Sequence, residues 1–279
     1  MTFRFANIAG RSALVDNQDN WHDLESLTGG SVSADPMVAV TDGAALHSAA
    51  DQLSGSTPSG ALADADVQAP VPAPRNAFGI GLNYRSHAAE SNMDLPENPL
   101  VFTKFSSCIS APDVDVELRT ETGDYEVELV VVMAGGGRDI PAEKAWDHVL
   151  GLTIGQDISD RGLQFASKPP HFDLGKSRDT YGPIGPVLVS TDSFADPGDV
   201  HLSCDINGER RQDDRTSNLL FDVPTLISYL SAIIAFAPGD MIFTGTPEGV
   251  GAATKNYLKP GDTIVSVIEG IGTMTNRCV

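Results

Sequence analysis

Apolar residues occur along most of the chain in short runs that turn-forming residues separate. One run, 114–118, alternates apolar and acidic residues with a period of two, and the others are short and nearly continuous, so all are typical of β-strands. They are 78–82, 100–104, 114–118 and 127–133, together with 200–206, 241–244 and 263–269, which each follow a Pro-Gly-Asp triplet. The dipeptide Asn207-Gly208 predicts a β-hairpin.

Helical patterns are confined to a few segments. Residues 141–150 and 222–236 are the clearest, and in the second Asp222 can cap a helix whose first turn contains Pro224. Strands outnumber helices and do not alternate strictly with them. The pattern therefore predicts a β-rich α+β fold rather than a Rossmann fold or a TIM barrel.

The first 70 residues have a different texture. They are rich in Ala, Ser, Asp and Gly, with strand-like runs at 3–8 and 13–15 and a candidate helix at 43–53. The stretch 69–74, Ala-Pro-Val-Pro-Ala-Pro, predicts a stiff, extended connector. We therefore expect a small N-terminal domain, residues 1–70, and a larger second domain, residues 71–279.

Composition and charge narrow the classes of function. The chain has 279 residues, of which 41% are hydrophobic, so it can bury a sizeable core. With 18 Lys and Arg against 38 Asp and Glu, the formal net charge is −20. Such a surface repels phosphate backbones and anionic lipid, so we expect no nucleic-acid or membrane partner. An anionic substrate would need a locally positive pocket.

The cysteines and the lack of apolar targeting segments indicate the cellular compartment of the protein. The three cysteines are far apart and lack a CxxC pair, which fits reduced thiols better than a disulfide framework or a zinc site. The N-terminal residues lack an apolar signal core, and no apolar run approaches the ~20 residues that cross a bilayer. We expect a soluble, cytoplasmic protein.

Two carboxylates near the start of the run 127–133 are the first candidates for chemistry. Glu126 and Glu128 are two positions apart, so in a strand both side chains leave the same face. If that face is buried, a cation should lie over it, because unpartnered buried anions are costly. Two oxygen donors suit Mg²⁺ or Mn²⁺ if a third carboxylate joins them. The alternative is an edge strand from which both point to solvent.

The third carboxylate is expected at Asp157, where the apolar run 151–157 ends. Asp157 could instead cap a helical turn predicted at 158–164. In a helix, Arg161 and Gln164 would share its face, and Arg161 could hold a substrate carboxylate or make an ordinary salt bridge.

A second cluster follows the run 78–82. His87 and Glu90 are three positions apart, so on a helical turn the carboxylate can orient the imidazole as a base that activates water. Lys176 and the glycine-rich stretch 245–251 are further candidates, the latter because its backbone can approach a ligand closely. Each has a structural alternative: a solvated His, a surface Lys or a plain tight turn.

Taken in order, these pieces resemble the fumarylacetoacetate hydrolase family over roughly residues 76–279. The matching motifs are Gly81-Leu82-Asn83-Tyr84 with His87 and Glu90, Phe102-Thr103-Lys104 with Ser106-Ser107, Asp124-Tyr125-Glu126-Val127-Glu128-Leu129, Asp157 with Arg161 and Gln164, Lys176-Ser177 with Asp179-Thr180, and Gly245-Thr246-Pro247 with Gly249-Val250-Gly251. Two positions differ from many relatives: Phe105 replaces a common Pro, and Arg178 replaces a common aromatic residue and so bears on pocket polarity.

The resemblance implies a β-rich fold, usually dimeric, with Mg²⁺ or Mn²⁺ on Glu126, Glu128 and Asp157. The His87–Glu90 dyad would lie on a segment, from about residue 84 to residue 99, that is mobile without ligand and orders over the substrate.

The remaining roles follow from the same resemblance. Lys176 and Gln164 would lie where oxyanion and carboxylate charge develops, and Arg161 and Thr246 would bind the substrate carboxylate. This arrangement would give an acidic protein the positive pocket that it needs.

The reaction implied is hydrolysis of a carbon–carbon bond in a β-diketo acid, an acylpyruvate such as fumarylpyruvate, of the kind formed in aromatic catabolism. The metal would polarise the α-keto acid and stabilise the enolate that leaves as pyruvate. Two alternatives stay open. One is a lyase that decarboxylates oxaloacetate on the same site without an attacking water, and the other is a protein that binds an α-keto acid without turnover.

Overall fold

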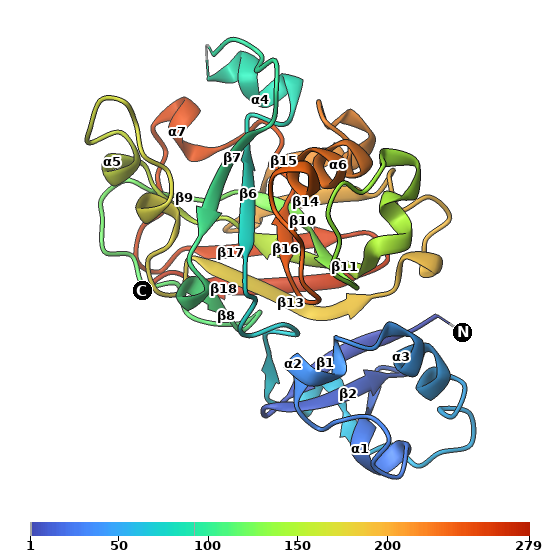
Figure 1. The fold of residues 1–279 in the computed structure, drawn as a ribbon. Helices are drawn as coiled ribbons and strands as arrows, with labels where there is room; N and C mark the ends of the chain where they lie inside the picture. The colour runs from blue at the N-terminus through green and yellow to red at the C-terminus, as the bar shows by residue number, and fades with distance from the viewer. Residues whose placement is uncertain (1, 92) are drawn as a thin grey trace.

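Strands dominate the computed structural model, which describes residues 2–91 and 93–279 (Figure 1). The strands are β1 (Arg4–Ile8), β2 (Arg11–Val15), β3 (Asn20–Asp23), β4 (Gly60–Ala61), β5 (Val67–Gln68), β6 (Ala77–Gly81), β7 (Leu100–Lys104), β8 (Ile109–Ser110), β9 (Gly123–Asp124), β10 (Val127–Met133), β11 (Val149–Gln156), β12 (Ser159–Asp160), β13 (Gly182–Val189), β14 (His201–Ile206), β15 (Glu209–Arg215), β16 (Met241–Phe243), β17 (Thr263–Ile268) and β18 (Gly272–Arg277).

The helices are short. The α-helices are α1 (Leu24–Leu27), α2 (Pro36–Ala39), α3 (Gly43–Ala50), α4 (Arg85–Glu90), α5 (Arg161–Gln164), α6 (Val223–Ile233) and α7 (Gly251–Thr254). The 3-10 helices are η1 (Leu62–Asp64), η2 (Ser106–Cys108), η3 (Ala142–His148), η4 (Leu174–Lys176), η5 (Thr191–Ser193) and η6 (Thr216–Asn218). No helix in the described part of the chain is long and apolar enough to cross a membrane.

Two sheets form the body of the protein. Over the described residues, twelve strands make one mixed sheet in which β10 lies between β11 and β16, antiparallel to both. A second, antiparallel sheet has the order β15-β14-β17-β18. The predicted β-rich α+β class is confirmed.

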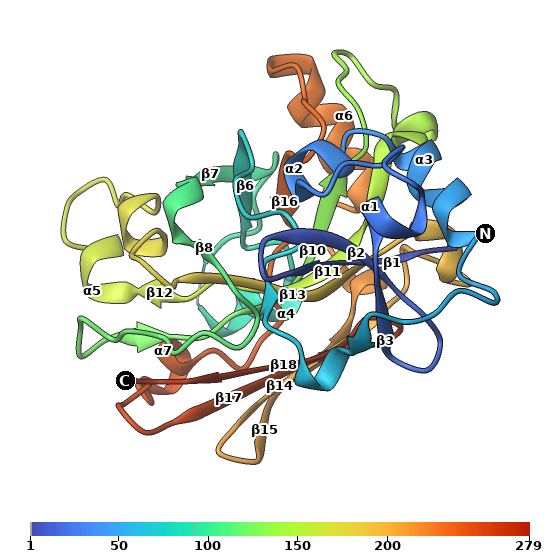
Figure 2. The same ribbon diagram turned by 90° about the horizontal axis from the view of Figure 1, so that it is seen from below.

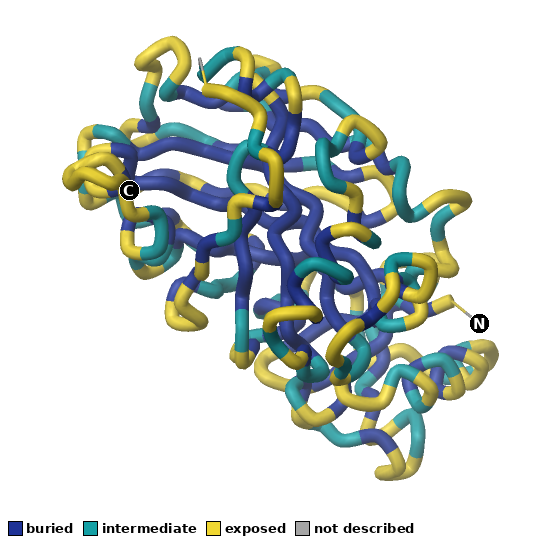
Figure 3. The backbone as a smooth tube through the Cα atoms, turned by 45° about the horizontal axis from the view of Figure 1, so that its top comes forward, coloured by how far each residue is buried: buried dark blue, intermediate teal, exposed yellow. Residues whose placement is uncertain are grey.

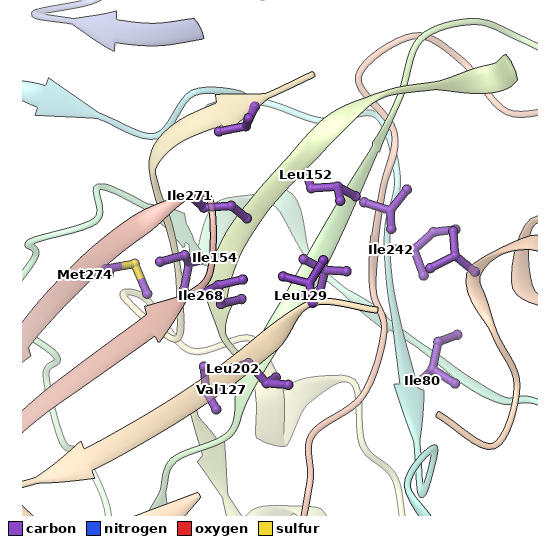
Figure 4. Packing of buried hydrophobic residues seen from close by; sticks show 14 of the residues in the cluster. Ile80, Val127, Leu129, Leu152, Ile154, Leu202, Ile242, Ile268, Ile271 and Met274 are labelled. Carbon is purple, nitrogen blue, oxygen red and sulfur yellow. The ribbon is translucent and has the colours of Figure 1, made fainter. Parts of the chain in front are cut away.

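Strand β10 has no solvent-facing side. Its odd-numbered residues, including Val127 and Leu129, pack with Leu202 and Ile268 of the smaller sheet (Figure 4). Even-numbered members such as Val130 lie in a second core on the opposite face. Fully burying one such side chain contributes about 1.5–3 kcal/mol. In Figure 3 the central strands are accordingly dark blue, and the edge-strand alternative for the Glu pair is wrong.

The N-terminal residues form the blue lobe of Figure 1, yet they are hydrogen-bonded into the main sheet. Strand β1 pairs with β13, with Phe5 opposite Leu188 (Figure 2). The Pro-rich connector packs against this lobe, because Asn7 Nδ2 donates to the Ala69 carbonyl at 2.9 Å and Val71 is fully buried. A boundary near residue 70 between independently folding units stays a prediction.

Three local predictions need correction. Residues 114–118 do not form a regular strand; their backbone bonds the C-terminal residues instead, with Val116 N–H donating to the Arg277 carbonyl at 2.7 Å. The segment 141–150 contains the 3-10 helix η3 instead of an α-helix. The turn after Asp157 becomes helical only at Arg161, because Ser159 and Asp160 first pair with β9.

Several turn and cap predictions are confirmed. Asn207 and Gly208 join β14 to β15, both with positive φ, at 53° and 80°, as a two-residue hairpin loop requires. The Asp222 side chain accepts the Thr225 N–H at the start of α6. These features depend on neighbouring residues alone, so the sequence pattern was sufficient to locate them.

Candidate active site

Three buried carboxylates, Glu126, Glu128 and Asp157, lie close together where β10 begins and β11 ends. Glu126, immediately before β10, and Glu128, within it, are 4% and 1% exposed. The antiparallel register sets Val127 opposite Gln156, which brings Asp157 beside Glu126; the Asp157 N–H donates to the Glu126 carbonyl at 2.9 Å. One oxygen from each carboxylate lies within 4.8 Å of the others. Asp157 is thus not a helix cap; Asp160 caps α5.

Cationic side chains cover the triad, as the buried-face argument predicts. The Lys176 ammonium donates to Glu126 Oε2 and to Asp157 Oδ2, both at 2.6 Å. Lys104, fully buried at the end of β7, donates to Asp157 Oδ1 at 2.6 Å. Burial lowers the pKa of Lys104, but Asp157, together with Cys108 and Glu128, raises it by more, so the net shift of this pKa is upward.

A second layer of pairing centres on Arg161. Its guanidinium donates to Asp124 at 2.8 Å, to Glu126 at 2.5 Å and to Gln164 at 3.1 Å. Asp124 is also fully buried and accepts the N–H groups of Gly251 and Ala252 at the start of α7, at 2.7 and 3.0 Å. Asp124 therefore links α7 to the arginine that contacts the triad.

The two glutamates of the triad differ in electrostatics. Burial raises the pKa of Glu126, but Lys176 and Arg161 more than reverse this and hold it well below the ordinary value. Burial, reinforced by the charges of Asp157 and Glu126, raises the pKa of Glu128 well above its usual range. Among the described residues, ammonium groups bond Glu126 and Asp157 but not Glu128, so Glu128 is the member whose charge is least neutralised.

The residues present fit a hard divalent cation. Three carboxylates offer closely spaced oxygen donors, the ligand type that Mg²⁺ and Mn²⁺ prefer. The unfavourable environment of the Glu128 carboxylate is one that an added cation would relieve. Glu128 is otherwise oriented by the Gly245 N–H, which donates to its Oε2 at 2.7 Å.

The predicted dyad is assembled on α4. His87 Nδ1 lies 2.8 Å from Glu90 Oε1, and the other oxygen of Glu90 accepts the Gly249 N–H at 2.9 Å. The Gly249 carbonyl in turn accepts the Tyr125 hydroxyl at 2.9 Å. One residue, Gly249, therefore connects the dyad to Tyr125, which is next to the candidate metal ligand Glu126.

Glycine is required at position 249. Its φ is +103°, and a Cβ there would lie 1.9 Å from the Arg211 carbonyl oxygen of β15. No larger residue fits without moving the loop. The glycine-rich stretch is thus more than a tight turn, since its backbone contacts both the dyad and Glu128.

A cavity of about 350 Å³ brings most of the predicted residues together. Seven of the nine predicted side chains line it: His87, Glu90, Glu126, Arg161, Gln164, Lys176 and Thr246. The remaining two, Glu128 and Asp157, are buried, and each has an oxygen within 4.8 Å of one of Glu126. Their burial explains why they are absent from the cavity wall.

The Thr246 hydroxyl, predicted to bind a substrate carboxylate, already has two hydrogen-bond partners within the protein. Its hydroxyl donates to the Val127 carbonyl at 2.9 Å and accepts from Gln212 at 2.8 Å. Arg178 also has a partner, because its guanidinium donates to Asp160 at 2.7 and 3.0 Å. Arg178 is not part of the cavity lining in the described residues, so its effect on pocket polarity is indirect.

Sequence reasoning assigned no role to Lys104, Asp124 or Tyr125, although all three lie within the quoted motifs. The position of Lys104 could have been informative, because a lysine at the end of an apolar strand is buried and then needs a buried anion as its partner. Asp124 and Tyr125 gave no such signal, because the partners of Tyr125 and Asp124 in the 249–252 segment are 124 to 128 positions away and Arg161, the other partner of Asp124, is 37 away.

The chain is similar to several known proteins. The model of the fumarylacetoacetate (FAA) hydrolase C-terminal domain matches residues 76–279. Over 215 residues, 76% of this chain and 68% of the relative, the chain is 40% identical to the mitochondrial oxaloacetate tautomerase FAHD2A of Homo sapiens.

Two solved structures are similar over nearly the whole chain. A candidate HpcE protein from Mycobacterium smegmatis has a TM-score of 0.93 and 43% identity, with 99% of each chain covered. Maleylpyruvate hydrolase from Sphingobium sp. SYK-6, in complex with manganese(II) and pyruvate, has a TM-score of 0.83 and 29% identity, with 99% of this chain and 98% of that chain covered.

Proposed function

The chain belongs to the fumarylacetoacetate hydrolase family, and from this premise we propose that it is a metal-dependent enzyme that hydrolyses a carbon–carbon bond in an acylpyruvate. The observation that carries the proposal is that Glu126 and the His87–Glu90 dyad line one cavity, and that Glu128 and Asp157 each have an oxygen within 4.8 Å of one of Glu126. The reaction needs a site for a hard cation and a base that activates water. The similar maleylpyruvate hydrolase, which holds manganese(II) and pyruvate, supports the same chemistry.

Mg²⁺ or Mn²⁺ held by Glu126, Glu128 and Asp157 would supply Lewis-acid chemistry at the α-keto acid end of the substrate. Because Nδ1 of His87 faces Glu90, the other ring nitrogen is left to take a proton from water. The water oxygen bonds to the remote acyl carbon, and the bond from that carbon to the pyruvate methylene breaks. The electron pair goes to the pyruvate fragment, which then takes a proton, and the products are a carboxylic acid and pyruvate.

The positive groups have separate tasks in this proposal. Lys176 and Gln164 face the developing negative charge at the cavity floor. Arg161 binds the substrate carboxylate, since Asp124, Glu126 and Gln164 use only part of its set of five N–H donors. We assign carboxylate binding first to Arg161, because the Thr246 hydroxyl proton is already used by a backbone carbonyl.

Pyruvate release from acylpyruvates, measured with Mg²⁺, with Mn²⁺ and with chelator, tests the proposal. We expect metal-dependent formation of equal amounts of pyruvate and carboxylic acid. Binding of oxalate with no turnover of any acylpyruvate would instead support an α-keto acid binding protein.

A second candidate function is chemistry on oxaloacetate, which the 40% identity to an oxaloacetate tautomerase favours. Tautomerisation moves a proton between carbon and oxygen and breaks no carbon–carbon bond, whereas decarboxylation releases CO₂; neither adds water. Substitution of His87 by Ala should abolish hydrolysis and spare decarboxylation. Homodimer formation and a cytoplasmic location also stay predictions, for sedimentation and cell fractionation to test; the human relative is named mitochondrial.

A further inference from the structure

The two ends of the cavity differ in chemistry. Its floor consists of buried polar groups, with Glu126, Arg161 and Lys176 all 9% exposed or less. Its rim is apolar and open, because Met93 and Phe165 are 44% and 51% exposed. A substrate whose α-keto acid end lies on the floor must therefore direct its acyl group toward the apolar rim.

Two aromatic residues, Phe165 and Phe172, line the cavity, and a third ring, Phe102, packs against Phe172. The Lys176 ammonium lies 5.1 Å from the centroid of Phe102. Phe102 packs edge-on against Phe172 at 5.7 Å between centroids, and Phe172 against Phe165 at 6.1 Å. We call the two cavity-lining residues Phe172 and Phe165 the aromatic wall, which Phe102 supports from outside the lining. Edge-to-face packing of this kind holds each ring by its neighbour, so the surface is formed in advance of binding.

The wall closely contacts the strand behind it. A Cβ at Gly81 would lie 3.5 Å from Phe172 and 3.1 Å from Leu100. Ile80 and Leu82 line the cavity on the same side. Several apolar residues, and not one exposed ring alone, therefore form this side of the cavity.

Among the described residues that line the cavity, no permanent cation lies at the rim to pair with a second carboxylate. In the described part of the chain, the cavity lining contains two permanent cations, Arg161 and Lys176, and both lie at the floor and are paired with buried acids. Arg178, the charged departure from the family pattern, is bonded to Asp160. A dicarboxylic substrate would thus place its second carboxylate against aromatic carbon without a partner.

We propose that this enzyme selects acylpyruvates whose acyl group is uncharged and apolar, alkyl or aryl, over those with a terminal carboxylate such as a fumaryl or maleyl group. The inference rests on the proposed function and narrows its substrate. The pyruvate end occupies the polar floor, and the acyl group packs along the aromatic wall. Each methylene buried there should raise kcat/KM by roughly fourfold, which corresponds to ~0.8 kcal/mol.

The test compares kcat/KM for acetyl-, hexanoyl-, benzoyl- and fumarylpyruvate with Mn²⁺. Hexanoyl- and benzoylpyruvate should exceed both acetyl- and fumarylpyruvate by about tenfold or more. The variant Phe165→Arg adds a cation at the rim and should shift the hexanoyl-to-fumaryl ratio at least tenfold toward fumarylpyruvate. Ile233→Arg, at an equally exposed apolar position of α6 that does not line the cavity, should leave the ratio unchanged.

Ratios measured within one protein sample do not depend on how much of it is folded. Wild-type preference for fumarylpyruvate, or a Phe165→Arg ratio equal to that of Ile233→Arg, would overturn the inference while leaving hydrolysis intact. Calorimetry with 2-oxooctanoate and 2-oxoglutarate in the presence of Mn²⁺ provides a readout without turnover. Tighter binding of 2-oxooctanoate in a protein that hydrolyses no acylpyruvate would support the apolar rim and contradict the proposed function.

Discussion

The backbone N–H of Gly249 donates a 2.9 Å hydrogen bond to Glu90 across 159 positions of the chain. The carbonyl of the same residue accepts the Tyr125 hydroxyl, so the orientation of Glu90, and through it of His87, depends on a residue next to the candidate metal ligand Glu126. The proposed base and the candidate metal site are therefore connected through Gly249 and Tyr125.

Removing the Tyr125 hydroxyl should loosen this unit. We expect Tyr125→Phe to lower kcat by roughly threefold to tenfold, the effect of one hydrogen bond, while Mn²⁺ affinity stays within error. Tyr229→Phe on α6 is the matched control and should change neither quantity. A Tyr125→Phe enzyme with reduced Mn²⁺ affinity and unchanged kcat would contradict the connection to the dyad.

The dyad itself should carry the hydrolytic step. His87→Ala should lower kcat by ~10²–10⁴-fold, and Glu90→Gln should lower it strongly as well, because it removes the charge that orients the imidazole. Calorimetric Mn²⁺ affinity should be retained in both. His201→Ala is a suitable control, since His201 and Asp213 form a similar pair at 2.7 Å on an exposed surface. Hydrolysis by His87→Ala within a few-fold of wild type would mean that another group activates water.

Removal of one of the three carboxylates should lower the affinity for the metal ion. Glu128→Ala should weaken Mn²⁺ binding by roughly 100-fold or more, because the remaining two carboxylates are already bonded to ammonium groups. The exposed Glu143, changed to Gln, should leave the affinity unaltered. Wild-type affinity in Glu128→Ala would show that the cation binds elsewhere.

Asp160 should make folding stability depend on pH. Burial raises the pKa of its carboxyl, but the Leu163 N–H and Arg178 outweigh burial and the net pKa is below the ordinary value. The carboxylate therefore stabilises the fold above about pH 4, the unfolded pKa, and this contribution is lost as pH falls through the lower folded pKa. Asp160→Asn, which keeps the helix cap, should reduce the free energy of unfolding by about 1 kcal/mol at pH 7 and have little effect near pH 2.

Urea unfolding at both pH values measures this difference. Asp222→Asn is the control, because Asp222 caps α6 through the Thr225 N–H in the same way. A loss that is equally large at pH 2 and pH 7 for Asp160→Asn would rule out the charge as its cause.

The segment that carries the dyad should respond to ligand. Its start is anchored, since Tyr84 is fully buried and Asn83 donates to the Phe221 and Thr244 carbonyls at 3.0 and 2.7 Å. We therefore expect oxalate with Mn²⁺ to slow amide hydrogen exchange over residues 85–91 and 93–99, beyond this anchor. Exchange that is already slow without ligand, and that ligand leaves unchanged, would argue against a lid.

Patterns between near neighbours could be predicted from the sequence because they depend on local geometry. The alternation in β10 determines that Glu126 and Glu128 share a face, and Asn207-Gly208 determines a hairpin. The spacing of His87 and Glu90 on one helical turn likewise determines their contact. The order of these motifs was enough to indicate the family before any three-dimensional information.

The tertiary structure alone decided which distant groups meet. The sequence does not specify that Lys104 reaches Asp157, that Asp124 holds the start of α7, or that Gly249 supports Glu90, since each contact joins strands and loops far apart in the chain. It also could not show that residues 114–118 bond the C-terminus. Such pairings depend on sheet order and loop closure, which are settled by the packing of the whole core, whereas alternation and turn residues act within a few positions.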